Sequence, residues 1–156
     1  MRKSKARKRV IVPDPRYNDV LVSKFINNMM MQGKKETARK IFYDAIDIVD
    51  GKVEEDAGID TWKKALNNVM PSVMVKSRRV GGATFQIPME VKPDLKVSFG
   101  IKWMIVYARK RNEKSMANKL AGEILAASKG EGAAVKKKED THKMADANKA
   151  FSHFRV

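Results

Sequence analysis

Residues 73–91 read VMVKSRRVGGATFQIPMEV, and this stretch decides the fold. Residues that favour β-structure lie on both sides of Gly81-Gly82, a pair of glycines that is typical of a tight hairpin turn. A lone two-stranded ribbon is only marginally stable in water, and the chain offers no other candidate strand to extend it. We therefore expect residues 72–91 to form a β-ribbon that projects as an arm from a helical body.

The register of this ribbon depends on the length of its loop. A two-residue loop sets Lys76 opposite Ile87 and mixes the two faces of the ribbon. A three-residue loop over residues 81–83 sets Val75 opposite Met89 and collects the apolar side chains on one face. We expect the three-residue loop, and the two-residue loop is the alternative.

Outside the ribbon, apolar residues recur with the period of an α-helix. The pattern predicts three helices before the ribbon and three after it. The expected fold class is therefore mainly α, a single-domain bundle of six helices with one projecting two-stranded β-ribbon. Residues that suit helix N-caps are Asn18 or Asp19 for the first helix, Asp60 for the third and Ser115 for the fifth.

The fourth expected helix begins at Pro93 and is apolar nearly all round as far as Ala108. A helix without a polar face is typical of the centre of a core. We therefore expect Trp103, near the middle of this helix, to be a buried core residue.

The charge of the chain is high and unevenly distributed. Lysine and arginine exceed aspartate and glutamate by 15 charges, yet residues 36–60 hold eight acids against three bases. Such segregation suggests one face turned to solvent and another laid along phosphates. A nucleic acid is therefore the expected partner.

A length of 156 residues favours one domain, and we expect residues 1–156 to form a single RNA-binding domain. Within it we distinguish a basic N-terminal arm over residues 1–13 and a flexible basic C-terminal segment with the last helix over residues 129–156. The chain contains no cysteine, and its apolar stretches are too short for a signal peptide or a membrane span. We expect a soluble protein that does not bind a membrane, and a cytoplasmic location is compatible with this composition.

The residues needed by common enzymes are missing. Gly81-Gly82 is followed by Ala83-Thr84 and not by the lysine and hydroxyl residue of a phosphate-binding loop. His142 and His153 lack the spacing of a metal site, which favours two exposed histidines near the C-terminus. We expect no catalytic residues, no metal, no cofactor and no small-molecule substrate.

Four groups of basic residues remain as candidate phosphate contacts, and for each the alternative is a solvated surface. One is the arm. Another lies at the start of the second helix, where the helix dipole would also favour a bound phosphate. The third flanks the ribbon turn with Phe85 nearby as a stacking ring, and the fourth follows the fourth helix. Their residues are Arg2, Lys3, Lys5, Arg7, Lys8 and Arg9; Lys34 and Lys35; Lys76, Arg78 and Arg79; and Arg109, Lys110, Arg111, Lys114 and Lys119.

Several sequence blocks, in order along the chain, resemble the family of bacterial-type small-subunit ribosomal protein seven. The resemblance covers essentially the whole chain. The blocks are Gly33-Lys34-Lys35, Val75-Lys76-Ser77-Arg78-Arg79-Val80-Gly81-Gly82, Ala108-Arg109-Lys110-Arg111 with Lys114-Ser115-Met116-Ala117, and Ala134-Val135-Lys136-Lys137 with Met144-Ala145-Asp146-Ala147-Asn148-Lys149-Ala150-Phe151.

The resemblance implies a structural protein that binds the 3′ major domain of 16S rRNA and initiates assembly of the head of the small subunit. It also implies a position beside the exit-site tRNA and the mRNA path, with small-subunit ribosomal proteins nine and eleven as neighbours. The implied rRNA contacts are the basic residues of the arm with Lys34, Lys35, Lys76, Arg78, Arg79, Arg109, Arg111, Lys114 and Met116. The implied residues near tRNA and mRNA are Arg79, Val80, Gly81, Gly82, Lys136, Lys137 and Lys138.

Two other functions are compatible with a basic helical protein. An architectural DNA-binding protein also uses basic β-arms, but its arms usually carry an apolar wedge at the tip, where this chain has two glycines. An RNA-modifying enzyme would need a cofactor loop or a convergent acid and base. The sequence favours the ribosomal role over both.

Overall fold

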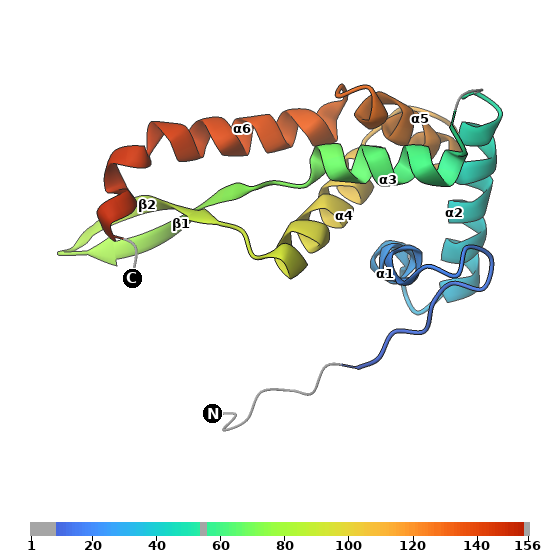
Figure 1. The fold of residues 1–156 in the computed structure, drawn as a ribbon, viewed down its shortest axis with the longest axis horizontal. Helices are drawn as coiled ribbons and strands as arrows, with labels where there is room; N and C mark the ends of the chain where they lie inside the picture. Colours follow the sequence, from blue (N-terminus) through green and yellow to red (C-terminus); the bar gives the residue numbers. More distant parts are fainter. Residues whose placement is uncertain (1–8, 54–55, 155–156) are drawn as a thin grey trace. The chain divides into compact units, whose positions relative to one another are not determined.

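The computed structural model describes residues 9–53 and 56–154. These residues form six α-helices, one two-stranded antiparallel ribbon and a short 3₁₀ helix, so the predicted mainly α fold class is confirmed (Figure 1). The chain divides into two compact units, residues 1–40 and 41–156. The prediction that residues 1–156 form one RNA-binding domain stays a prediction.

In the first unit, a turn stabilised by Asp14 leads into helix α1 (Val20–Met29). The Asp14 carboxylate is almost completely buried and accepts hydrogen bonds from the backbone N–H groups of Arg16 and Tyr17. Asp19 caps α1, because its side chain accepts a hydrogen bond of 2.7 Å from the Leu21 N–H. Of the two expected capping residues, the structure therefore selects Asp19 over Asn18.

Helix α2 (Lys35–Asp50) begins in the first unit and continues into the second. In the second unit its buried residues include Phe42, which packs edge to face on Trp62 of α3 (Gly58–Val69) with ring centroids 5.3 Å apart. The Trp62 side chain has no exposed surface. Large rings buried in this way contribute strongly to a core.

Helix α3 begins three residues earlier than the sequence predicts, because Ala57 and not Asp60 is its N-cap residue. Asp60 lies inside its first turn and is not the cap, so that prediction is wrong. The physical reason is that the Asp50 carboxylate, at the end of α2, accepts a hydrogen bond from the Gly58 N–H. A side chain at position 58 would collide with Asp50 and with the Ile46 carbonyl, so this close approach requires glycine.

Helices α4 (Pro93–Arg109) and α5 (Met116–Ser128) pack with α3 to form the centre of the second unit. Gly100 lets α4 approach α3, because a Cβ at this position would lie 2.8 Å from the Met70 side chain. Ser115 caps α5 by accepting a hydrogen bond from the Asn118 N–H, as predicted. Core residues with almost no exposed surface are Trp62, Leu66, Ile101, Met104, Leu120 and Ile124.

The prediction that Trp103 of α4 is a buried core residue is wrong. One side of α4 is buried, and its residues are Gly100, Ile101, Met104, Ile105 and Ala108. Trp103 is only half-buried, and Leu95 and Val106 are exposed. The prediction for Trp103 failed because apolar residues lie on every side of this helix, and such a pattern does not indicate which side faces the core.

The ribbon consists of β1 (Val73–Val80) and β2 (Ala83–Glu90), and no other strand occurs in the described parts of the chain. Val80 pairs with Ala83, so the loop has two residues and the predicted three-residue loop is wrong. Gly81 and Gly82 have φ values of +58° and +89°, the two successive positive angles that a type I′ turn requires.

The three-residue loop was expected because it collects the apolar side chains of the ribbon on one face. A single apolar face is not needed, because the neighbouring residues Ile87 and Pro88, which point to opposite faces, are both buried. Helix α6 (Ala133–Ala147) contacts both strands, and the 3₁₀ helix η1 (Lys149–Phe154) contacts β2 (Figure 1). The C-terminal segment thus runs along the ribbon as far as Phe85, three residues from the turn, where Phe151 of η1 packs on it.

Candidate nucleic-acid interface

The ribbon presents a basic tip. Lys76, Arg78 and Arg79 are all exposed on β1, and the Arg79 Nε donates to the Gly82 carbonyl across the turn at 3.3 Å. Phe85, expected to be a ring available for stacking, is half-buried against Phe151 of η1 with ring centroids 5.2 Å apart. The tip therefore offers cations, while Phe85 fixes the C-terminal segment to the ribbon.

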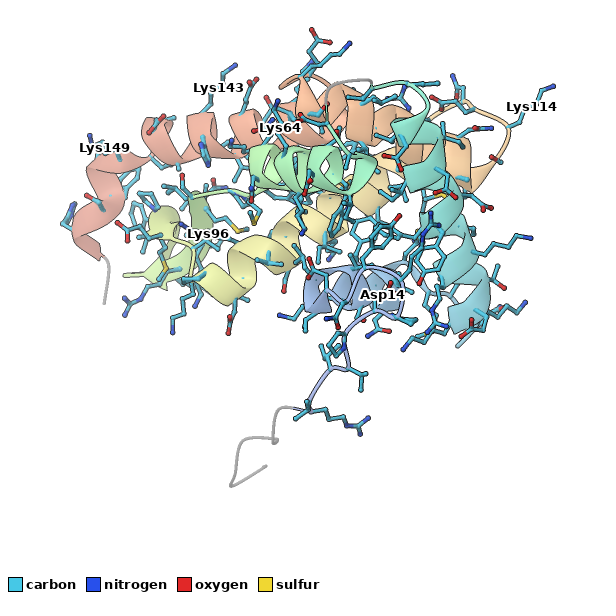
Figure 2. All side chains as sticks on the ribbon, turned by 45° about the vertical axis from the view of Figure 1, so that its right-hand side comes forward. Asp14, Lys64, Lys96, Lys114, Lys143 and Lys149 are labelled. Carbon is cyan, nitrogen blue, oxygen red and sulfur yellow. The ribbon has the colours of Figure 1, made fainter. Side chains whose placement is uncertain are left out.

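A second basic cluster lies where α4 meets α5. Arg109 and Lys110 are exposed at the end of α4, and the Lys110 ammonium lies over the Tyr107 ring at 5.1 Å. Lys114 is exposed in the loop between α4 and α5. In Figure 2 it lies at the opposite end of the second unit from Lys149, the first residue of η1, and η1 contacts strand β2 of the ribbon. The interface predicted from sequence therefore has two separate basic ends within this unit.

Two further residues border this second cluster. Lys119 is half-buried on α5, and its ammonium donates to the Arg109 carbonyl at 3.4 Å. Met116 is half-buried as the first residue of α5. Lys119 therefore fastens the end of α4 to α5 rather than extending freely into solvent.

Arg111 is bound within the protein. Its Nε donates to Glu113 Oε1 at 2.8 Å, and a terminal guanidinium nitrogen donates to Glu123 Oε2 at 3.0 Å. The hydrogen bond to Glu113 raises the pKa of Arg111, and the same bond lowers the pKa of Glu113 below its usual range. This geometry gives Arg111 a structural role, because its two ion pairs hold the α4–α5 loop on α5.

Sequence inspection missed Glu123, whose side chain has no exposed surface. Its Oε1 accepts a hydrogen bond of 2.9 Å from the Ala134 N–H, in the first turn of α6, while its Oε2 accepts from Arg111. An anion near a helix N-terminus is stabilised by the helix dipole. The signal was visible in the sequence, because Glu123 stands between the apolar residues Leu120 and Ile124 on the core side of α5.

Gly122 brings the loop and α5 together. A Cβ at this position would lie 2.8 Å from a Glu113 carboxylate oxygen and 3.0 Å from the Arg111 Nε. The small residue therefore leaves space for the Arg111–Glu113 pair above α5. Lys114 is consequently carried on a loop that is fastened at both ends.

The three lysines of α6 differ in their surroundings. Lys136 is exposed, Lys137 is half-buried, and the Lys138 ammonium donates to the Asn68 carbonyl near the end of α3 at 2.9 Å. Nearby, His142 accepts a hydrogen bond of 3.1 Å from the Ser72 N–H, so this histidine is not simply exposed. Lys138 and His142 hold α6 to the body, and Lys136 is directed to solvent.

In the first unit, Lys34 and Lys35 are exposed at the beginning of α2, as the sequence predicts. Arg9 is exposed as well. The other basic residues of the arm lie outside the described residues, and they are Arg2, Lys3, Lys5, Arg7 and Lys8.

Charge is segregated along the second unit. Residues 41–71 contain seven acids and three bases, whereas residues 72–156 contain 18 bases and eight acids. The positive charge therefore belongs to the ribbon and to helices α4, α5 and α6. Among the described residues, no group of three or more histidine, aspartate or glutamate side chains could hold a metal ion. In the same residues, no helix has the length and apolarity needed to cross a membrane.

Comparison with known proteins gives a consistent result. A profile of the family described as ribosomal protein S7p/S5e matches residues 1–149. Similar proteins include the small ribosomal subunit protein uS7 of Flavobacterium psychrophilum, 66% identical, and that of Christiangramia forsetii, 67% identical, each over 99% of both chains. The Bacteroides fragilis protein of the same name is 57% identical, again over 99% of both chains.

Proposed function

Because the chain belongs to the ribosomal protein S7p/S5e family and is a structural ribosomal protein rather than an enzyme, we propose that it anchors ribosomal RNA. Its ligand in the small subunit is the 3′ major domain of 16S rRNA. By binding there early it initiates assembly of the subunit head. The place of action is the cytoplasmic ribosome.

The observation that carries this proposal is the segregated charge of the second unit. Its acids are concentrated before residue 72, whereas its excess of bases follows that residue. Lysines and arginines that displace condensed counterions from RNA gain affinity from the entropy of the released ions. A surface that concentrates bases on the ribbon and on α4, α5 and α6 suits a long polyanion.

The proposed primary contacts are the exposed cations at the α4–α5 junction and at the start of α2. Arg109 and Lys114 belong to the first group, and Lys34 and Lys35 to the second. Lys114 is held on a loop that Arg111 fastens to Glu123, so less side-chain and loop entropy is lost when RNA binds. Met116 in the second unit and the basic residues of the arm in the first unit are further proposed contacts. In this assignment Arg111 holds the loop in position, because its guanidinium donates hydrogen bonds to the carboxylates of Glu113 and Glu123.

The ribbon has a different proposed role. Eight residues in each strand give it a length of about 26 Å at roughly 3.3 Å per residue, enough for its tip to reach a ligand that the body does not touch. We assign residues 79–82 and the basic stretch 136–138 to the vicinity of the exit-site tRNA and the mRNA. Small-subunit ribosomal proteins nine and eleven are the proposed protein neighbours.

The test is binding of the full chain to an isolated transcript of the 3′ major domain, measured by filter binding at several salt concentrations. Each phosphate contact adds about 0.7 to 0.9 to the slope of log affinity against log salt, so many contacts give a steep fall. Duplex DNA of equal length should displace little of the RNA, because 2′-hydroxyls and shape are recognised as well as charge. A flat salt response contradicts the proposal, and equal competition by DNA favours an architectural DNA-binding role.

A further inference from the structure

The outer side of α4 carries an apolar stripe that the core does not use. Leu95, Phe99, Trp103 and Val106 are separated by four, four and three residues, a spacing that puts them on one side of a helix. Leu95 is 49% exposed and Val106 is 36% exposed, while Phe99 and Trp103 are half-buried. The opposite side of the same helix supplies the buried residues that pack in the core.

Two aromatic rings form the middle of this stripe. The ring centroids of Phe99 and Trp103 are 6.0 Å apart, and the rings are inclined by 39°. The chain has two tryptophans, and the other one, Trp62, has no exposed surface. Core packing explains Trp62, but it does not explain a large ring that remains accessible on the outer side of α4.

The stripe is bordered by positive charge. Residues 92–110 contain five bases and only one acid, Asp94. Lys96 and Lys102 are on either side of the apolar stripe when the helix is viewed along its axis, and Lys96 is labelled on α4 in Figure 2. One turn beyond the rings, the Lys110 ammonium lies over the Tyr107 ring.

We propose that Phe99 and Trp103 form a stacking platform on the outer side of α4 for unpaired bases of the bound RNA, with Lys96 and Lys102 holding the adjacent phosphates. This inference rests on the proposed rRNA-binding function and identifies a site within it. Aromatic rings combined with cations match the chemistry of a nucleotide, because each base has a π-face and each phosphate a negative charge.

The bases must be unpaired. In an A-form duplex the base faces are covered by their neighbours, whereas bases in loops, bulges and junctions can stack on protein rings. The platform would therefore add selectivity for folded RNA with exposed bases, which phosphate contacts alone do not give. A continuous duplex would use only the lysines.

The first experiment uses tryptophan fluorescence. Trp62→Phe removes the buried indole, keeps an aromatic ring against Phe42, and leaves Trp103 as the only tryptophan. Adding the 3′ major domain transcript should quench the Trp103 emission and reduce its accessibility to acrylamide. A duplex RNA of equal length should leave both signals nearly unchanged at the same bound fraction.

The second experiment compares affinities by filter binding. Trp103→Leu keeps an apolar side chain but loses the ring, and it should weaken binding of the transcript by roughly five- to 150-fold, since one stacked base contributes about 1 to 3 kcal/mol. Trp103→Phe should retain most of the affinity. Tyr43→Leu is the matched control, because Tyr43 is also half-buried but lies on the acidic helix α2.

The outcomes separate the platform from the function on which it rests. Failure of the parent chain to bind the transcript overturns both. Tight binding with unchanged Trp103 emission and acrylamide access, or an unaffected Trp103→Leu variant, overturns the platform alone. Protection of Trp103 that appears only in the assembled subunit would assign the stripe to a protein neighbour and would also overturn it.

Discussion

The ribbon tip and the core formed by α3, α4 and α5 differ in what stabilises them. Every described side chain from Lys76 to Arg79 is exposed, and the tip is held by paired backbones and a two-glycine turn. In the core, Trp62, Leu66 and Ile124 have almost no exposed surface. The difference indicates that stability and the proposed RNA recognition depend on separate residues, so each can be changed with limited effect on the other.

The largest expected effect is on the core side of this comparison. Trp62→Ala should lower the free energy of unfolding by about 3 to 5 kcal/mol, as for other buried aromatic residues replaced by alanine. Trp103→Ala, at a half-buried position, should lower it by only about 1 kcal/mol. Urea denaturation followed by circular dichroism measures both values. Equal losses would show that the outer side of α4 is part of the core.

The second prediction concerns the buried Glu123 carboxylate, which joins the α4–α5 loop to the start of α6. Glu123→Ala leaves the Arg111 guanidinium and the Ala134 N–H without this acceptor and should lower the free energy of unfolding by about 2 to 3 kcal/mol. Glu113→Ala, which removes the more exposed partner of Arg111, is the matched control and should cost much less. Similar melting of the two variants would contradict the structural role of Glu123.

A smaller effect is expected from pH at the same loop. Arg111 lowers the pKa of Glu113 below its ordinary value of 4.5. A carboxyl whose pKa is lowered on folding stabilises the protein fully above its ordinary pKa, and this stabilisation disappears as the pH falls through the lowered value. Glu113→Gln should therefore flatten the pH dependence of stability below about pH 4.5. An unchanged acid profile, measured by urea denaturation, would show that the pair does not affect folding.

The N-terminal arm should have almost no effect on stability. Residues 1–9 contain six bases and no large aliphatic or aromatic residue after Met1, so their deletion should leave the melting temperature nearly unchanged. The same deletion should weaken RNA binding and reduce its salt dependence, because up to six phosphate contacts are lost. A large fall in melting temperature would mean that the arm contributes to folding.

Local sequence signals predicted much of this fold. The helices, the ribbon and the capping residues Asp19 and Ser115 depend on neighbouring residues, and the structure confirms them. Distant contacts explain the errors. At the start of α3, the Gly58 N–H donates to the carboxylate of Asp50 in α2, and Asp60 is not the capping residue. The C-terminal segment packs along the ribbon, so the ribbon does not need to collect its apolar side chains on one face.

The candidate site was less accessible to sequence reasoning. Exposure of Lys34, Lys35, Lys76, Arg78 and Arg79 follows from local pattern, but the partners of Arg111 and Phe85 do not. Arg111 meets Glu123 across the α4–α5 junction, and Phe85 meets Phe151, which lies 66 residues later in the chain. A basic or aromatic residue can be identified from sequence, whereas its availability to a ligand depends on tertiary contacts.

The most direct test of the separation between tip and core is a shortened ribbon. Replacing residues 79–84 with Asn-Gly makes Arg78 and Phe85 the closing pair and keeps the two-residue loop and the existing register. The variant should melt like the parent and bind the 3′ major domain transcript within about twofold, because Lys34, Lys35, Arg109 and Lys114 remain. Loss of transcript binding with an unchanged melting temperature would place the primary rRNA anchor in the ribbon tip and contradict the proposed division of roles.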